Sequence, residues 1–232
     1  MLHYNFFKSQ NDSKQLLVML HGFISDSTTY DSHIEQLRQH VNVLTIDLPG
    51  HGQDTSDMSD TWDFPYIAHA LDEVLSQYSM YDVCLLGYSM GGRVALYYAL
   101  NGSVALRGLL LESTSAGIQS EADKVERVQV DAARAKVLEI AGLEIFVNDW
   151  EKLPLFRSQY ELDAEVRKAI RANRMSQNPV RLAKALRDYG TGNMPNLWPQ
   201  VSSLRVRTLI LTGEKDEKFV QIRSEERRVG KE

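Results

Sequence analysis

The stretch VCLLGYSMGGRVALYYAL, Val83 to Leu100, decides the fold. It begins with an apolar run typical of a buried strand, passes through a glycine-rich turn, and ends in residues that favour a helix. Gly87, Ser89 and Gly91 match G-x-S-x-G, the nucleophile elbow, in which a strained strand-to-helix turn exposes the serine oxygen. We expect glycine at both ends because a Cβ there would collide with the strand or the helix. The pentapeptide alone also allows a structural turn, but the flanking strand and helix favour the elbow.

Composition limits the class of protein and its partners. The 232 residues are 43% hydrophobic and 25% charged, which fits one globular domain with room for a small inserted subdomain. A net charge of -5 provides no basic surface, so we expect neither nucleic acid nor a membrane as a partner. The single cysteine, Cys84, suits a reducing compartment, and the first residues lack the apolar stretch of a signal peptide. We therefore expect a cytoplasmic location, and the oligomeric state stays open.

Apolar runs and helical patterns alternate on both sides of the elbow. The runs that we predict as strands are Leu2–Phe7, Leu16–Leu20, Val41–Leu48, Leu106–Glu112 and Arg207–Thr212. Residues 27–39 and 64–77 have the spacing of amphipathic helices. This alternation predicts an α/β fold with a doubly wound, mostly parallel sheet.

The pattern changes after the strand that follows the elbow. Between residues 115 and 189 no strand-like run occurs, and four charged segments predict helices: Glu121–Glu139, Leu143–Lys152, Ala164–Ala172 and Pro179–Tyr189. We interpret residues 115–189 as a helical cap, and residues 1–114 with 190–222 as the core domain. Such a cap would cover the carboxyl edge of the sheet, where open α/β sheets bind ligands.

Two backbone donors are candidates for an oxyanion hole. The run LLVML ends in His21-Gly22-Phe23, upstream of the elbow. In the hydrolase arrangement one donor lies in this loop and the other follows the nucleophile, which here gives the N–H groups of Phe23 and Met90. A plain strand-to-loop turn is the alternative. His51 precedes Ser89, whereas the triad of this fold runs serine, acid, histidine, so we reject it as the base.

Asp216 follows a predicted strand and is the expected triad acid; the alternative is a loop aspartate that caps a helix. The six histidines all precede it: His3, His21, His33, His40, His51 and His69. The last residues, 223–232, read RSEERRVGKE and resemble a translated sequencing adapter. We therefore expect the native sequence to diverge near Ile222. The last strand and helix and the catalytic histidine would then be missing, and this truncated chain would be inactive.

Longer motifs narrow the function. HGF, DLPGHG and GYSMGGR are common to many α/β-hydrolases, whereas the segments ERVQVD, FVNDWEKLPLF, NRMSQNP, RLAKALRDYGTGNMPNLW and LTGEKDEKFVQI are more discriminating. With them the chain, almost to Ile222, resembles the 2-succinyl-6-hydroxy-2,4-cyclohexadiene-1-carboxylate synthases, the MenH family of menaquinone biosynthesis. The resemblance implies an α/β-hydrolase fold and a lyase. That lyase eliminates pyruvate from 2-succinyl-5-enolpyruvyl-6-hydroxy-3-cyclohexene-1-carboxylate without a metal or organic cofactor.

The resemblance also implies the residues that bind this polycarboxylate. They are Arg93, Arg127, Arg174, Tyr88 and Trp150. Arginine forks fit carboxylates, and Arg93 lies one helical turn beyond Ser89. The alternatives are solvated arginines and core aromatics. Two rival functions stay open: a carboxylesterase or C–C hydrolase of the same fold, and a non-catalytic hydrolase-like binding protein.

Overall fold

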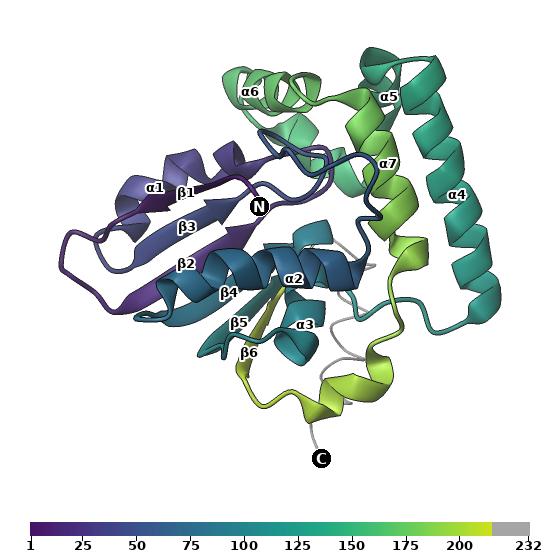
Figure 1. Cartoon of the computed structure of the whole chain (residues 1–232). Coiled ribbons are helices and arrows are strands. Elements are labelled where there is room, and N and C mark those ends of the chain that lie inside the picture. Colours follow the sequence, from purple (N-terminus) through teal and green to yellow (C-terminus); the bar gives the residue numbers. More distant parts are fainter. Residues whose placement is uncertain (215–232) are drawn as a thin grey trace.

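The computed structural model describes residues 1–214, and their centre is a six-stranded sheet (Figure 1). The strand order is β1-β3-β2-β4-β5-β6, in which β1 is antiparallel to β3 and the other pairs are parallel. The strands are β1 Tyr4–Phe7, β2 Gln15–Leu20, β3 Asn42–Ile46, β4 Asp82–Tyr88, β5 Gly108–Glu112 and β6 Arg207–Leu211. The elbow strand β4 therefore lies between β2 and β5, inside the sheet.

Helices connect the strands and cover both faces of the sheet. The α-helices are α1 Asp31–Leu37, α2 Phe64–Leu75, α3 Met90–Asn101, α4 Glu121–Ile140, α5 Leu143–Trp150, α6 Ala164–Met175 and α7 Pro179–Tyr189. Short 3-10 turns are η1 Ser27–Tyr30, η2 Ser76–Tyr78, η3 Pro154–Glu161, η4 Thr191–Asn193 and η5 Trp198–Ser203. Helix α3 packs on β4, β5 and β2 and contacts α2, whereas α1 packs on β3. The predicted α/β class and its mostly parallel sheet are confirmed.

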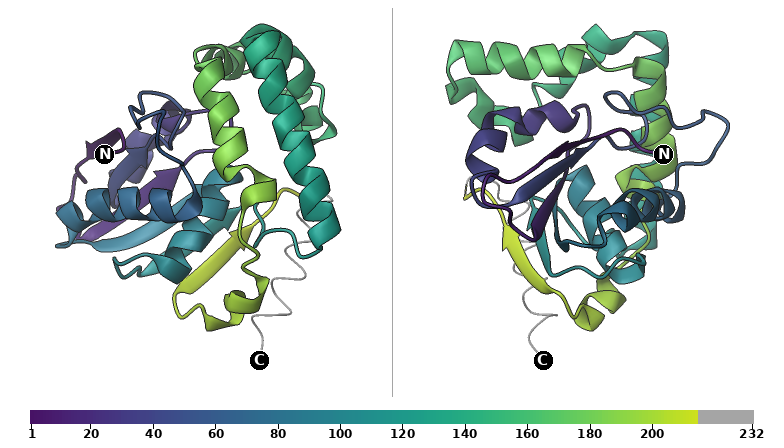
Figure 2. Two further views of the ribbon diagram at one scale, coloured as in Figure 1. Left: turned by 45° about the vertical axis from the view of Figure 1, so that its right-hand side comes forward. Right: turned by 60° about the vertical axis from the view of Figure 1, so that its left-hand side comes forward.

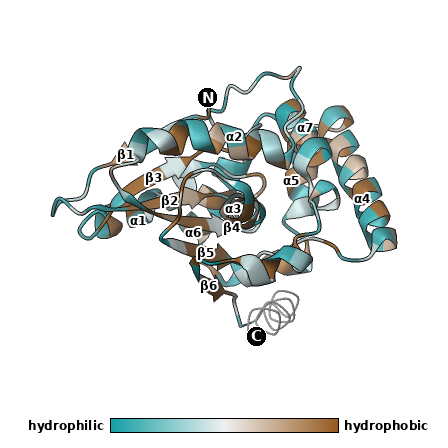
Figure 3. Cartoon of the chain, turned by 60° about the horizontal axis from the view of Figure 1, so that its bottom comes forward, coloured by the Kyte–Doolittle hydropathy of each residue, from teal (hydrophilic) through white to brown (hydrophobic). Residues whose placement is uncertain are grey.

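The side-chain period of the strands divides the core between the two faces. In β2, Leu16, Val18 and Leu20 belong to the large cluster shared with α2 and α3. Met19 points the other way, into a smaller cluster with Val43 of β3 and α1. Figure 3 shows this distribution as brown strands between helices that carry both teal and brown faces. All five residues of β3 are buried, as expected of a strand covered on both faces, whereas β4 and β5 alternate between buried and half-buried residues.

The helices between residues 121 and 189 form a separate layer. Figure 2 shows α4 and α7 side by side, and the two helices pack against each other. Their own apolar cluster includes Leu138 of α4, Phe146 of α5 and Leu182 of α7. Ile24, from the loop after β2, is buried in the same cluster, so this loop anchors the layer.

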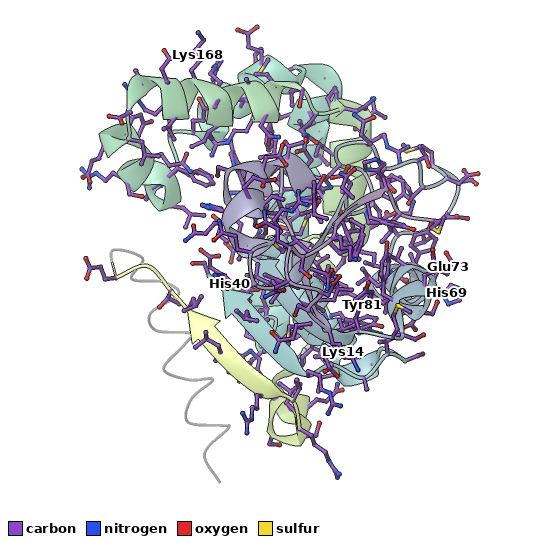
Figure 4. All side chains as sticks on the ribbon, turned by 90° about the vertical axis from the view of Figure 1, so that its left-hand side faces the viewer. Lys14, His40, His69, Glu73, Tyr81 and Lys168 are labelled. Carbon is purple, nitrogen blue, oxygen red and sulfur yellow. The ribbon has the colours of Figure 1, made fainter. Side chains whose placement is uncertain are left out.

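The two ends of the parallel strands face different surroundings. Lys14 and Tyr81 precede β2 and β4, and Figure 4 shows them at the end of the molecule away from Lys168 on α6. The carboxyl ends of β2 and β4 lead into the loops that carry Phe23 and Ser89. The helical layer therefore lies at the end of the sheet where the candidate residues lie.

Candidate active site

Ser89 occupies the strained turn between β4 and α3. Its φ of 52° and ψ of -107° leave the common regions for a residue with a Cβ. Its N–H donates to the carbonyl of Glu112 at the end of β5 (2.9 Å), and its own carbonyl accepts from the Thr114 hydroxyl (2.8 Å). The neighbouring strand thus holds the strained turn from both sides, as expected where strain is retained at a functional site.

The two motif glycines are required by close backbone contacts. A Cβ on Gly87 would collide with the backbone carbonyl of Gly91, in the first turn of α3. A Cβ on Gly91 would collide with the carbonyl of Leu20 and lie 2.6 Å from that of His21. Real Cβ atoms do not come so close, so the strand-turn-helix geometry excludes every residue but glycine at both positions.

The loop after β2 is fixed directly against the elbow. The N–H of Gly91 donates to the carbonyl of His21 (3.0 Å), and the Tyr88 ring would lie 2.9 Å from a Cβ on Gly22. Ile24 in this loop has a φ of 56°, which is rare for a β-branched residue. Met90 is the first residue of α3, so its N–H has no intrahelical acceptor. These positions are compatible with paired donors at Phe23 and Met90.

His21 has a structural role. Its Nδ1 lies 2.7 Å from the carbonyl of Gly22, and its Nε2 accepts from the Leu48 N–H at 3.0 Å. The ring is fully buried, and burial lowers its pKa. With both nitrogens engaged, His21 ties the loop after β2 to the loop after β3 and has no nitrogen left for Ser89.

His51 is also a poor candidate for the base. Its Nδ1 lies 3.1 Å from the carbonyl of Pro49 and 3.2 Å from the Tyr189 hydroxyl, while its buried Nε2 has no partner among the described residues. Burial, with the neighbouring His21, lowers the pKa of His51 to about 3. The ring packs edge-on against Phe23. His51 therefore stays neutral and supports the oxyanion loop.

Arg93 is a buried cation beside the elbow. It is 8% exposed, and its Nη1 donates to the carbonyl of Tyr189 at 3.2 Å. Burial and the neighbouring Arg127 lower the pKa of Arg93 to about 10, whereas Asp131 opposes this shift. The guanidinium remains charged at neutral pH, although no carboxylate forms an ion pair with it among residues 1–214. An anionic ligand would compensate this buried charge.

Two arginines of α4 accompany Arg93. Arg127 donates through Nε to Asp131 (2.9 Å), and the Nη1 of Arg134 lies 3.8 Å from the same carboxylate. Asp131 is buried and also accepts from the N–H of Gly192. We call Arg93, Arg127, Arg134 and Asp131 the α4 arginine cluster. It contains three cations and one carboxylate.

An aromatic wall joins this cluster to the oxyanion loop. Trp150 lies edge-on to Phe23, with ring centroids 5.4 Å apart, and it stacks on Phe146. Its buried Nε1 has no hydrogen-bond partner among the described residues. The guanidinium of Arg134 lies over the Trp150 ring, 5.3 Å from its centroid.

Arg174 belongs to a second group, which is centred on Glu151. Its guanidinium donates to Glu151 (3.0 Å) and Gln159 (2.9 Å) and lies over Phe156. Arg171 pairs with the same Glu151 at 2.7 Å, and Phe156 contacts Trp150. The structure therefore brings Arg93 and Arg127 together and places Arg174 apart from them.

The remaining candidate residues divide into placed and unplaced ones. Tyr88 ends β4 with its ring against Gly22, beside Ser89. Asp216 lies outside the described residues, and the sequence has no histidine after it.

Within residues 1–214 no cluster of three or more potential ligands is arranged to hold a metal. No helix in that range is both long and apolar enough to cross a membrane.

The sequence analysis missed Arg134 and Asp131. Arg127, Asp131 and Arg134 have the spacing i, i+4, i+7, which places them on one face of α4. That signal was present in the sequence. It did not show that this face of α4 would lie against α5 and η4.

Comparison with known proteins agrees with the fold and identifies the family. The model of the alpha/beta hydrolase family matches residues 17–231. The 2-succinyl-6-hydroxy-2,4-cyclohexadiene-1-carboxylate synthase of Salmonella agona is 33% identical over 88% of this chain and 78% of its own length. That of Citrobacter koseri is 33% identical over 90% of this chain and 81% of its own.

A solved structure gives the same result in three dimensions. MenH from S. aureus is 57% identical, covers 100% of this chain with 87% of its own, and superposes with a TM-score of 0.98. The predicted resemblance is confirmed at the level of both sequence and structure. The chain belongs to the alpha/beta hydrolase family and, within it, to the MenH group of 2-succinyl-6-hydroxy-2,4-cyclohexadiene-1-carboxylate synthases.

Proposed function

We propose that this protein is a carbon–oxygen lyase that eliminates pyruvate from 2-succinyl-5-enolpyruvyl-6-hydroxy-3-cyclohexene-1-carboxylate. The product is 2-succinyl-6-hydroxy-2,4-cyclohexadiene-1-carboxylate, the compound that the names of its relatives specify. The observation that carries the proposal is the pairing of a strained serine with an excess of buried positive charge, one helical turn away at Arg93. A neutral ester needs no such charge, whereas a polycarboxylate does.

The reaction requires one proton transfer and one bond cleavage. In the proposed step Ser89 Oγ takes a proton from ring carbon C2, and the C–H electron pair forms a C2=C3 double bond while the ring double bond moves from C3=C4 to C4=C5. The C–O bond to the enolpyruvyl group breaks, and pyruvate leaves as its enolate, which gains a proton to become the keto acid. Ser89 acts as a base and no acyl-enzyme forms, in contrast to an esterase.

The backbone and the cations act on different charges. The N–H groups of Phe23 and Met90 would offset negative charge that develops on the substrate, because they are fixed before the reaction begins. Arg93, Arg127 and Arg174 would bind substrate carboxylates. Tyr88 and Trp150 would line the pocket around the cyclohexene ring of the substrate. Asp216 would orient the histidine that activates the serine.

Replacement of Ser89 tests this proposal. The protein expressed from its complete gene should release pyruvate from the enolpyruvyl substrate, measured in a coupled assay. Ser89→Ala should lower kcat about 10²–10⁴-fold, the usual contribution of a general base, with the melting temperature unchanged. The control is p-nitrophenyl acetate. Faster turnover of this ester than of the enolpyruvyl substrate would favour an esterase. If Ser89→Ala lowers kcat for the enolpyruvyl substrate by less than about tenfold, Ser89 is not the base.

For the location we propose the cytoplasm. The sequence contains one cysteine, Cys84, which is partly buried on β4, and a reducing compartment suits such a chain.

A further inference from the structure

Arg134 differs from the other partly buried arginines of the helical layer in its hydrogen bonding. Arg171 donates to Glu151 and Asn148, and Arg181 donates to Asp54 and to a backbone carbonyl. The guanidinium of Arg134 reaches its nearest carboxylate, on Asp131, only at 3.8 Å, which is too long for a hydrogen bond. Among the described residues, its five N–H donors therefore have no acceptor.

The one carboxylate of the α4 arginine cluster is already engaged. One carboxylate oxygen of Asp131 accepts a hydrogen bond from Nε of Arg127, and the other accepts from the N–H of Gly192. Burial, together with the nearby charge of Arg127, lowers the pKa of Arg134. Among the described residues, Asp131 is therefore the one counter-ion near three like charges on α3 and α4: Arg127 binds it, Arg134 reaches it only at 3.8 Å, and Arg93 forms no ion pair with it.

The position of Arg134 also favours contact with a ligand. The Arg134 side chain is 29% exposed, lies over the ring of Trp150, and so borders the wall that touches Phe23 of the oxyanion loop. Arg93, of the same cluster, lies one turn beyond Ser89 on α3. Beside Arg134, the buried Nε1 of Trp150 is a further donor that has no partner within residues 1–214.

We infer that Arg134 is a further substrate-binding residue, whose guanidinium takes one carboxylate of the substrate at the side of the site lined by Trp150. The inference rests on the proposed function for the identity of the substrate. Arg93 and Arg134 would then each hold a separate carboxylate and together fix the position of the substrate ring. Specificity for a polycarboxylate follows, because a monocarboxylate would leave one of these cations uncompensated.

Direct binding tests this inference separately from turnover. The probe is 2-succinylbenzoate, a stable aromatic compound with a ring carboxylate and a succinyl arm, titrated by calorimetry into the protein from its complete gene. Arg134→Gln should weaken binding at least tenfold, and Arg134→Lys should restore part of the loss because it keeps the charge. The matched control is Lys136→Gln, which removes the same charge from the exposed outer face of α4 and should change binding less than twofold.

An uncharged ligand distinguishes carboxylate binding from a structural role. The dimethyl ester of 2-succinylbenzoate should bind equally to Arg134→Gln and to the unchanged protein. Equal weakening of acid and ester, or less than twofold weakening of the acid, would overturn the inference. If the protein releases no pyruvate but binds 2-succinylbenzoate in an Arg134-dependent way, the proposed function fails and the inference stands. In the pyruvate assay, Arg134→Gln should raise KM more than it lowers kcat.

Discussion

The elbow and the α4 arginine cluster lie one helical turn apart but are built in different ways. The elbow consists of backbone from one continuous stretch, clamped by hydrogen bonds from β5 and from Thr114. The arginine cluster consists of side chains from α3 and α4, with its acceptors on Asp131 and on the backbone near Tyr189. The elbow is rigid because close backbone contacts allow its turn no other conformation. The arginine cluster depends on how the helical layer packs against α3.

Substitutions at the elbow and in the arginine cluster should therefore have different consequences. An error in the elbow disturbs the fold, because strand, turn and helix are in backbone contact at Gly87 and Gly91. An error in the arginine cluster removes a charge from a site that still folds. Three predictions follow from this contrast, in order of expected effect.

Gly91→Ala should break the elbow. The added Cβ would meet the carbonyls of Leu20 and His21, which are backbone atoms of a central strand and cannot turn aside. We expect a loss of about 3 kcal/mol in the free energy of unfolding, measured by urea denaturation. Gly213→Ala is the control, because a Cβ there has open space and should cost less than about 0.5 kcal/mol. Equal effects of the two substitutions would contradict the close packing described for the elbow.

Arg93→Met should impair recognition and leave the fold intact. Methionine retains much of the apolar stem while it removes the charge near Ser89. We expect kcat/KM for pyruvate release to fall by about 1.5–3 kcal/mol, with a normal melting curve.

Arg174→Met sharpens the same comparison. Glu151 would keep Arg171 as its partner, so the change leaves no unpaired carboxylate. We expect a loss in kcat/KM smaller than that of Arg93→Met. The reverse order would show that the group around Glu151, rather than the α4 arginine cluster, dominates recognition.

Acid should destabilise the loops on either side of the elbow. Burial lowers the pKa of His21 and His51, the latter to about 3, from the ordinary value of 6.5. Below pH 6.5 the unfolded chain therefore binds more protons than the folded one, and stability falls as the pH falls. For each neutral histidine the expected slope is about 1.4 kcal/mol per pH unit.

Unfolding curves between pH 4 and 7 measure this slope. His51→Gln should flatten it, because one of the two buried imidazoles is gone. His69→Gln is the matched control, since the His69 side chain is 79% exposed. An unchanged slope in His51→Gln would mean that the buried ring takes up its proton in the folded state.

The sequence alone determined the elements and the elbow. The motif around Ser89 predicted a strand, a strained turn and a helix within Val83–Leu100, and the structure has β4 and α3 within Asp82–Asn101. The four helical segments after Ser115 were also predicted, because periodicity and breakers are local properties. Ends were less exact: the strand expected at Val41–Leu48 spans Asn42–Ile46.

Only the tertiary structure decided which charges belong together. Arg93, Arg127 and Arg174 carry the same charge in the sequence, yet the fold places two of them around Asp131 and gives the third to Glu151. It also brought Arg134 over Trp150, 16 positions away in the sequence. The physical reason is the range over which these interactions act. Hydrogen bonding and steric contacts along the backbone involve residues that are close in the sequence, whereas the pairing of charges depends on their distance in the folded structure.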